Sequence, residues 1–523
     1  MSEDKLPRPR LDQAALVVGF GAEFIDRPED GLERDFATRR DPDAAQGMSR
    51  FIQFEGRLTL TGANADKRVR VRDSHLPLLA SALAKAMVVD QKVGPLAGNA
   101  ELAAALAKHD LATAAKETGV PLDFLKGLIT ELLAARGKVI LLAGGSASAG
   151  AGGLALETAV AVLNQSLGAY QSPAFDKKME GPRLSPPITD LVSLVADMKG
   201  NKVATLLIAG PNPVYDAPAG VDFSGAMANV KHIVSLNDRV DETSALADYL
   251  APASHALEAW GDAALGADLY GVQQPVIRPL YNTHGLFDVL ISWAAAAGAR
   301  GSLAEAADQT RPAAKDWAPP ELSSAAYYFV KTHWIRNILP GAGAWEDALR
   351  QGWYKKAAPA PAPVAAPAPA TEGSDDAVIA ASAAPGARLA HADSGEGAGL
   401  SLAAVLHRTG LTPEAITLLK LPASTPGDLE LQLYPHFALE DGRAGNNGWL
   451  LEFLDPITRL TWGGALSMAP RRFDEMKLKD GDLLEVAAGG KSLTLPAYRH
   501  AGMHQDQVAI PLGLGRTMAG EIG

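Results

Sequence analysis

The chain has 523 residues, a formal net charge of −12, 47% hydrophobic residues and no cysteine. This length predicts about two to four domains with real cores, and the acidic balance disfavours a non-specific nucleic-acid binder. The absence of cysteine excludes disulfides, thiol nucleophiles, and iron–sulfur clusters or molybdenum held by cysteine of this chain.

Apolar runs alternate with helical stretches in the first part of the sequence, which we treat as one region, 1–354. Continuous apolar strands separated by helices are typical of a parallel sheet covered on both faces. We expect strands at 15–20, 50–55, 138–145, 203–210 and 231–236, and helices at 74–88, 100–117, 120–136, 153–168 and 187–199.

The sequence "FEGRLTLTGANADKRVRVR" begins at the end of the second of these strands and then becomes polar. Thr59, Thr61, Asn64 and Asp66 cluster around Gly62, and several cations follow. Ligands of such sheets bind at the carboxyl ends of the strands. The cluster is therefore either a ligand site or the remains of one.

Two glycine-rich turns also follow expected strands. "GFGAEF" begins like a dinucleotide fingerprint, but Phe24 stands where the third glycine is needed for close packing, so NAD(P) binding is disfavoured. "GGSASAGAGG" begins at Gly144, Gly145 and Ser146, and its backbone amides could bind an anion. It lacks the lysine of a P-loop, and the alternative is a turn of small residues that permits tight packing.

Further polar residues occupy the segment between 209 and 262. "AGPNPVYDAP" ends a strand, and Asn212 can hydrogen-bond its own backbone there. His255 and Glu258 are candidates for acid–base chemistry, although a single histidine beside Trp260 is more often structural.

The histidine spacing does not predict a metal site. His500 and His504 are four residues apart, which would suit a metal on a helix, but Gly502 and the strand context argue against a helix. No third ligand is nearby, and no catalytic set can be identified. We therefore predict no metal and no catalytic residue.

No membrane span is expected in this chain. The strongest apolar run, "LFDVLISWAAAAGA", is shorter than the roughly 18 residues that a spanning helix needs, and it contains Asp288. The N-terminal residues have no long apolar segment, so they are not a signal peptide. Any membrane association or export would come through partners.

The composition changes after residue 354. Residues 355–398 include "AAPAPAPVAAPAPAT", which favours extended polyproline II, and we interpret them as an Ala/Pro-rich linker or surface excursion. Residues 399–523 contain short strands with glycine-rich turns, a pattern typical of a β-barrel.

Several long motifs together resemble one family. They are "LTLTGANADKRVRVR", "NPVYDAP", "DETSALADYLAPASHALEAWGD", "QQPVIRPLYNTHG" and "NNGWLLEFLDPITRLTWGGALSMAP". The sequence from about residue 15 to the C-terminus, without the Ala/Pro segment, resembles the molybdopterin-oxidoreductase-like B-type subunit of alternative complex III. That complex is a membrane-bound respiratory quinol oxidoreductase.

The resemblance implies an α/β fold with the layered parallel-sheet domains of the molybdopterin oxidoreductases, followed by a double-psi β-barrel that corresponds to their dinucleotide-binding domain. It also implies that the domain holds no molybdenum and no other cofactor. The polar strand ends would then be vestigial, which makes Thr61, Asn64, Asp66, Gly144, Gly145, Ser146 and Asn212 vestigial cofactor-binding candidates.

The resemblance further implies the partners and the location. The partners are an iron–sulfur ferredoxin-like subunit or domain, an NrfD-like membrane quinol-binding subunit and cytochrome c subunits. Iron–sulfur clusters and haems would lie in these partners, and the chain would scaffold the iron–sulfur partner. It would be peripheral on the membrane, on the periplasmic side, through co-translocation with its partners.

Family members carry an additional N-terminal domain and often a cysteine-rich ferredoxin-like domain, and neither is found in this sequence. We expect a split gene, with a partner chain supplying the clusters, or a shortened paralogue. Two alternatives stay open: a subunit of a related quinone reductase complex, and a true molybdopterin-dependent oxidoreductase with Asp66 or Ser146 near the metal.

Overall fold

The computed structural model describes residues 8–27, 31–43, 47–176, 188–218, 220–265, 268–301, 324–356, 416–421 and 429–522. Two compact units divide the chain. Unit 1 contains Met1–Gly181, Asp197–Ala253 and Leu400–Gly523, and unit 2 contains Pro182–Ala196 and Ser254–Gly399. The predicted linker lies outside the described residues except for its first two, and the domain boundaries stay predictions.

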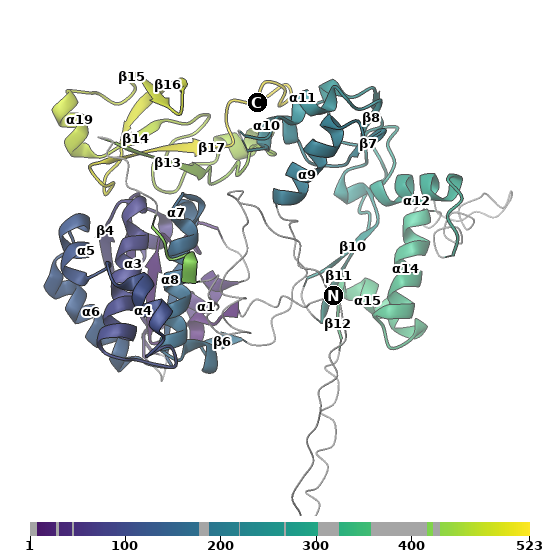
Figure 1. Cartoon of the computed structure of the whole chain (residues 1–523). Coiled ribbons are helices and arrows are strands. Elements are labelled where there is room, and N and C mark those ends of the chain that lie inside the picture. Colours follow the sequence, from purple (N-terminus) through teal and green to yellow (C-terminus); the bar gives the residue numbers. More distant parts are fainter. Residues whose placement is uncertain are drawn as a thin grey trace, which may run out of the picture. The chain divides into compact units, whose positions relative to one another are not determined.

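A four-stranded parallel sheet forms the centre of the first part of unit 1 (Figure 1). Its order is β4 (Lys67–Arg70), β3 (Arg50–Glu55), β2 (Leu16–Phe20) and β5 (Val139–Ala143). Every residue of β2 is buried, as expected for a continuous apolar run inside a covered sheet. The polar edge strand β4 was not predicted.

Side chains of alternate residues on β2 and β3 build two cores on opposite faces of this sheet. Val18 and Ile52 pack in the larger core with α3 (Leu76–Ala84), α6 (Leu122–Ala134) and α8 (Gly153–Ser166). Val17 and Phe51 pack on the other face with α1 (Leu32–Thr38). The sheet is therefore covered on both sides, as the sequence predicts.

The helix expected at 100–117 is two helices, α4 (Ala100–Leu106) and α5 (Leu111–Thr118). Asp110 separates them, because its carboxylate accepts a hydrogen bond from the backbone N–H of Thr113 at 2.9 Å. This contact caps the start of α5 and ends the continuity that the apolar pattern suggested.

Unit 1 contains three further groups of strands. The first is an antiparallel pair, β1 (Arg8–Pro9) and β6 (Phe175–Asp176). The second is a parallel sheet of β7 (Thr205–Ile208), β8 (His232–Ser235) and β9 (Tyr249–Leu250), with the short helices α10 (Pro213–Asp216) and α11 (Phe223–Met227) close in sequence.

The third group is a mixed five-stranded sheet in the region predicted as a barrel. Its order is β13 (Glu430–Pro435), β17 (Gln507–Leu512), β14 (Leu466–Met468), β16 (Lys491–Arg499) and β15 (Leu483–Ala488). The helices α18 (Gly448–Glu452) and α19 (Pro470–Met476) lie between its strands in sequence.

Unit 2 has an antiparallel sheet of β10 (Gly261–Ala264), β11 (Leu269–Gln273) and β12 (Trp353–Lys355). Its helices are α12 (Leu286–Ala296), α14 (Ala325–Asn337) and α15 (Trp345–Gln351). The aromatic residues Trp260, Tyr327, Trp334 and Trp345 form much of its core. The helix α9 (Ile188–Lys199) crosses the division between the units.

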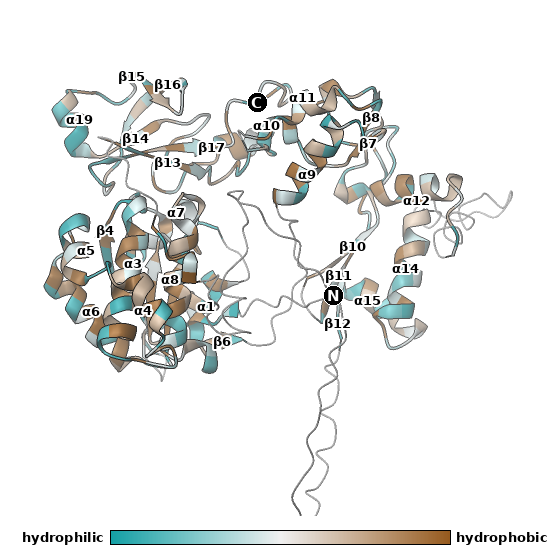
Figure 2. Ribbon diagram, in the orientation of Figure 1, coloured by the Kyte–Doolittle hydropathy of each residue, from teal (hydrophilic) through white to brown (hydrophobic). Residues whose placement is uncertain are grey.

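The helix α12 is coloured largely as hydrophobic in Figure 2, but it has only 11 residues. Among the described residues, no helix combines the length and the hydrophobicity that crossing a membrane requires.

Candidate functional site

The polar sequence after β3 folds into the short helix α2 (Leu60–Ala63), capped by Thr59. The Thr59 Oγ1 atom accepts a hydrogen bond from the Gly62 N–H at 2.9 Å and donates one to the Glu55 carboxylate at 2.6 Å. The Thr61 hydroxyl donates to the Asp26 carboxylate at 2.7 Å, and the same carboxylate accepts from the Leu60 and Thr61 N–H groups. These groups form a closed network within the chain.

The side chains of Asn64 and Asp66 also form hydrogen bonds with other residues of the chain. The exposed Asn64 amide donates to the Leu60 carbonyl at 2.8 Å, which caps the end of α2. Asp66 accepts two hydrogen bonds from Arg40, at 2.7 and 2.8 Å, and one from the Phe51 N–H. The Arg40 guanidinium lowers the pKa of Asp66, so this carboxylate is held as a charged partner.

Gly144, Gly145 and Ser146 follow β5 and open the five-residue helix α7 (Gly145–Ala149). Gly145 has φ +58°, and an added Cβ would lie 2.6 Å from the Gly21 carbonyl, so the two turns approach closely. The Ser146 hydroxyl donates to Asp73 at 2.8 Å and accepts from the Gln432 amide of β13. Ser146 therefore links the parallel sheet to the C-terminal sheet.

Asp73 lies in an unusual electrostatic position beside this serine. Burial raises its pKa to about 6, and the nearby Glu430 acts in the same direction, while the hydrogen bond from Ser146 opposes the change. Glu430 itself accepts hydrogen bonds from the Ser74 N–H at 3.0 Å and from Arg72 at 3.4 Å. Two carboxylates thus meet where β13 contacts the segment after β4.

The prediction that the Asn212 side chain bonds its own backbone is wrong. Its Oδ1 atom accepts from the Thr243 hydroxyl at 2.6 Å and from the Thr243 N–H at 3.1 Å. Its Nδ2 atom donates to Glu242 at 2.7 Å, and Glu242 pairs with Arg516 at 2.8 Å. The partners come from distant loops that the local sequence does not reveal.

His255, Glu258 and His504 make local structural contacts, whereas neither ring nitrogen of the buried His500 has a hydrogen-bond partner among the described residues. His255 Nδ1 accepts from the Leu257 N–H at 3.2 Å, and Glu258 accepts from the His255 N–H at 3.1 Å, which completes a capping box. His504 Nδ1 accepts from the Asp506 N–H at 3.2 Å. His500 is buried, and its pKa is lowered to about 4, first by burial and then by Arg57.

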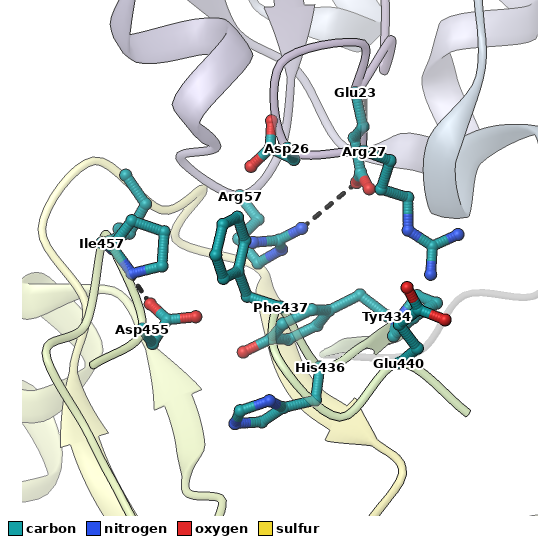
Figure 3. A pocket seen from close by; sticks show the side chains of 12 residues that line it. Glu23, Asp26, Arg27, Arg57, Tyr434, His436, Phe437, Glu440, Asp455 and Ile457 are labelled. Carbon is teal, nitrogen blue, oxygen red and sulfur yellow. Dashed lines mark hydrogen bonds and ion pairs between the residues drawn. The ribbon is translucent and has the colours of Figure 1, made fainter. Parts of the chain in front are cut away.

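A pocket of about 410 Å³ lies in unit 1 between the ends of the parallel strands and the loops of the C-terminal sheet (Figure 3). Arg57 is central to it. Its guanidinium pairs with Glu23 at 3.1 Å and lies over the Tyr434 ring, 3.8 Å from the centroid. The remaining lining residues are Asp26, Arg27, Pro435, His436, Phe437, Glu440, Asp455, Pro456 and Ile457.

Burial and fixed hydrogen bonds set the electrostatics of this pocket. Burial raises the pKa of Glu23, while Arg57 acts in the opposite direction. His436 Nδ1 accepts from the N–H groups of Ala438 and Leu439, which leaves the proton of the neutral ring on Nε2. Burial also lowers the pKa of His436, so this ring is neutral at pH 7.

None of the pocket residues was among the sequence candidates. Glu23 belongs to the "GFGAEF" turn, which we considered above only as a possible dinucleotide-binding motif. Arg57 and Tyr434 are 377 positions apart in the chain (434 − 57) and come from regions with different patterns. No local spacing signals such a contact.

Comparison with solved structures defines the class of the fold. The chain has the layered α/β fold of the molybdopterin-oxidoreductase type. It is similar to acetylene hydratase from Pelobacter acetylenicus, with a TM-score of 0.63 and 14% sequence identity over 99% of this chain and 74% of that chain. No family model matches the sequence, and no curated protein matches it. The predicted fold class is confirmed.

Side chains of the chain itself fill the space beside three glycines at the strand ends. A Cβ atom added at Gly19, Gly56 or Gly62 would overlap the side chains of Gln53, Gln507 or Glu55, respectively. A glycine has no side chain, so it can leave space for a ligand to approach the backbone. At these three glycines, other side chains of the chain occupy that space, which we call the glycine hollow. The residues at these three positions therefore do not fit a cofactor placed against the strand ends.

Proposed function

We propose that this chain is a non-catalytic structural subunit of a membrane-bound quinol oxidoreductase of the alternative complex III type. The observation that carries the proposal is the filled strand end: the side chains of Gln53 and Glu55 occupy the hollows beside Gly19 and Gly62. The polar groups of Thr61 and its neighbours are bound to other residues of the same chain.

Exposed apolar side chains support an assembly role. In unit 2, Leu257, Val276, Leu280 and Tyr281 are exposed by 51%, 74%, 72% and 80%. Hydrogen bonds fix the segment 276–281 against the segment around Leu257. The Val276 N–H donates to the Leu257 carbonyl at 2.7 Å, and the Leu280 N–H donates to Glu258 at 3.1 Å. An ordered loop with contiguous exposed apolar side chains is typical of an interaction site.

In this proposal the redox centres belong to partners: an iron–sulfur ferredoxin-like subunit, cytochrome c subunits and an NrfD-like membrane quinol-binding subunit. The sequence offers no cysteine as a cluster ligand. Within the described residues, no group of three or more histidine and acidic side chains is arranged to hold a metal ion. Electrons would pass beside this chain, on the periplasmic side of the membrane.

A second candidate function is a true molybdopterin-dependent oxidoreductase. One observation favours it: Gln53 Oε1 and Gln432 Oε1 are buried near the strand ends and have no hydrogen-bond partner. Buried polar atoms normally find a partner, and a bound ligand or an ordered water molecule would provide one. The filled glycine hollows make us prefer the scaffold.

Purification of the tagged chain from its native membranes tests both functions. The scaffold predicts co-purifying haem and iron–sulfur subunits, together with quinol oxidation by the assembled complex. The chain separated from these partners should contain no stoichiometric molybdenum. One molar equivalent of molybdenum on the isolated chain would establish the second candidate, and a chain purified without any redox partner would contradict the first.

A further inference from the structure

The loop from α18 to Trp462 exposes an unusual amount of apolar surface. Trp449 is exposed by 84%, Phe453 by 52%, Leu454 by 49% and Trp462 by 53%. We call these four side chains the apolar rim. Aromatic side chains of this size bury about 150–250 Å² each when covered. The apolar rim therefore supplies about half of the roughly 800 Å² that each side of a stable interface contributes.

The apolar rim continues directly into the pocket. Phe453 stacks on the pocket residue Phe437, with the ring centroids 6.0 Å apart and the ring planes inclined by 16°. The next residues after Leu454, from Asp455 to Ile457, line the pocket themselves. The apolar rim and the charged pocket are therefore adjacent parts of unit 1.

Hydrogen bonds hold this region in shape. The Trp462 N–H donates to the Leu451 carbonyl at 2.8 Å, and Asp455 Oδ1 accepts from the N–H groups of Ile457 and Thr458 at 3.0 and 2.7 Å. Arg459 and Trp462 adopt left-handed backbone conformations, with φ of 64° and 58°, which are uncommon for residues other than glycine. The exposed side chains are thus presented by a fixed backbone.

The pocket carries more negative than positive charge. Its lining includes Glu23, Asp26, Glu440 and Asp455 against Arg27 and Arg57. Asp26 is occupied by the start of α2. In the part of the chain that the structure describes, Glu440 makes no side-chain hydrogen bond or ion pair, although Arg27 points toward it in Figure 3. Among the same described residues, the side-chain hydrogen bonds of Asp455 all go to its Oδ1 atom. The excess charge is complementary to a cation.

Arg57 shows which chemistry this pocket accommodates. Its guanidinium already lies over an aromatic ring and pairs with a carboxylate, through Tyr434 and Glu23. Its Nε–H, in contrast, is buried and has no hydrogen-bond partner. The exposed fraction of the Arg57 side chain is only 7%.

We propose that the apolar rim and the pocket together dock a protein segment that presents an arginine or lysine flanked by apolar residues. The basic side chain pairs with Glu440 in the pocket, and the apolar neighbours cover Trp449 and Phe453. The inference rests on the proposed function, because it names one contact surface of a scaffold subunit. An anionic lipid surface is disfavoured by the negative pocket.

Site-specific photo-crosslinking tests this docking surface, since the native chain has no cysteine. Leu454→Cys, labelled with benzophenone maleimide, reports on the rim and leaves the pocket charges intact. Leu493→Cys on β16, whose leucine is exposed by 52%, is the matched control. In the complex purified from membranes we expect the Leu454→Cys probe to label a partner peptide that contains a basic residue beside apolar ones. Labelling of lipid, or of this chain alone, would overturn the inference.

A charge reversal adds a readout that a folding defect would not reproduce. Glu440→Lys should reduce co-purification of the cross-linked partner at least tenfold, and Glu485→Lys on β15 should not. Replacing the basic residue of the labelled partner peptide with glutamate should restore binding to the Glu440→Lys chain. Unchanged partner recovery with Glu440→Lys, or no rescue, would count against the inference.

The two proposals fail in different ways. If the wild-type chain co-purifies with no quinol oxidoreductase subunit, the proposed function fails and the docking inference fails with it. If those subunits co-purify and remain bound to the Glu440→Lys chain, only the docking inference fails.

Discussion

Arg516 pairs with Glu242 across 274 positions of the sequence, with its Nε atom 2.9 and 3.0 Å from the two carboxylate oxygens. Both side chains are buried, with exposed fractions of 8% and 9%. The N–H groups of Thr517 and Met518 also donate to Glu242. This carboxylate therefore fastens the C-terminal segment to the loop after β8.

Glu242→Gln should destabilise the protein and reduce its sensitivity to acid. Burial alone would raise the pKa of Glu242, but the hydrogen bonds from Arg516 and Asn212 lower it well below its usual value. A carboxylate with a lowered pKa stabilises the fold above its unfolded pKa, and this contribution is lost as the pH falls below about 4.5. Breaking a buried pair typically costs about 3–5 kcal/mol at neutral pH.

Urea unfolding at pH 7 and pH 4 measures this effect. The wild-type chain should lose more stability between the two values than the Glu242→Gln chain loses. Asp441→Asn is the control, because the pair of Asp441 with Arg443 is exposed and such pairs contribute about 0–1 kcal/mol. Equal acid sensitivity in the wild-type and Glu242→Gln chains would contradict the expected role.

Asp73→Asn should stabilise the protein at neutral pH. The pKa of Asp73 is about 6 in the folded state, against an ordinary value of 3.8. The folded state therefore prefers the protonated carboxyl, and the associated stability is present at low pH and is lost as the pH rises through about 6. Each pKa unit corresponds to about 1.4 kcal/mol, so the gain at pH 8 is on the order of 1–3 kcal/mol.

The free energy of unfolding at several pH values from 4.5 to 8 checks the Asp73 prediction. The wild-type curve should fall relative to the Asp73→Asn curve across this range, and Asp238→Asn, an exposed surface change, should leave the curve parallel to wild type. Parallel curves for Asp73→Asn would show that the carboxyl titrates normally.

Thr61→Val and Asn64→Ala should separate a buried contact from an exposed one within the same loop. The Thr61 hydroxyl is fully buried and donates to Asp26, so its removal leaves buried polar groups unpaired, at a cost of about 1–3 kcal/mol. The Asn64 amide is exposed, and its loss should cost at most about 0.5–1.5 kcal/mol.

Thermal unfolding and quinol oxidation, normalised to intact complex on a native gel, measure these two variants. We expect Thr61→Val to lower the melting temperature more than Asn64→Ala does. Turnover per assembled complex should stay close to wild type for both. A tenfold loss of normalised turnover with normal assembly would show that the loop is a working site.

Elemental analysis should find no stoichiometric molybdenum, iron or zinc on the isolated chain. The physical reason is that the chain has no cysteine and that, within the described residues, no group of three or more histidine and acidic side chains could hold a metal ion. The intact complex is the positive control, because it should contain iron. Stoichiometric metal on the isolated chain would refute the vestigial interpretation.

The sequence predicts correctly those strands whose residues are apolar because both faces of the sheet are buried. The strands β2, β3 and β5 are covered on both faces, so their apolar runs identify them. The strand β4 lies at the edge and has the polar sequence "KRVR", which gives no such signal. The helix break at Asp110 was not predicted. A helix cap depends on one side chain, whereas the hydrophobic periodicity used to predict helices averages over many residues.

The site was less accessible to sequence reasoning. Local contacts such as the His255–Glu258 capping box follow a recognisable spacing and could have been identified. The contacts of Arg57 with Tyr434 and of Glu242 with Arg516 join segments hundreds of positions apart. A single sequence carries no record of such proximity, because the chain path between them decides it.

The polar edge strand β4 has a consequence for contacts between separate copies of the chain. Lys67 and Arg70 are exposed along the free side of the parallel sheet, while Arg68 turns back to pair with Glu55. Cations on an open edge repel a second strand that would add to it. The charged edge thereby protects the chain from edge-to-edge aggregation with other copies.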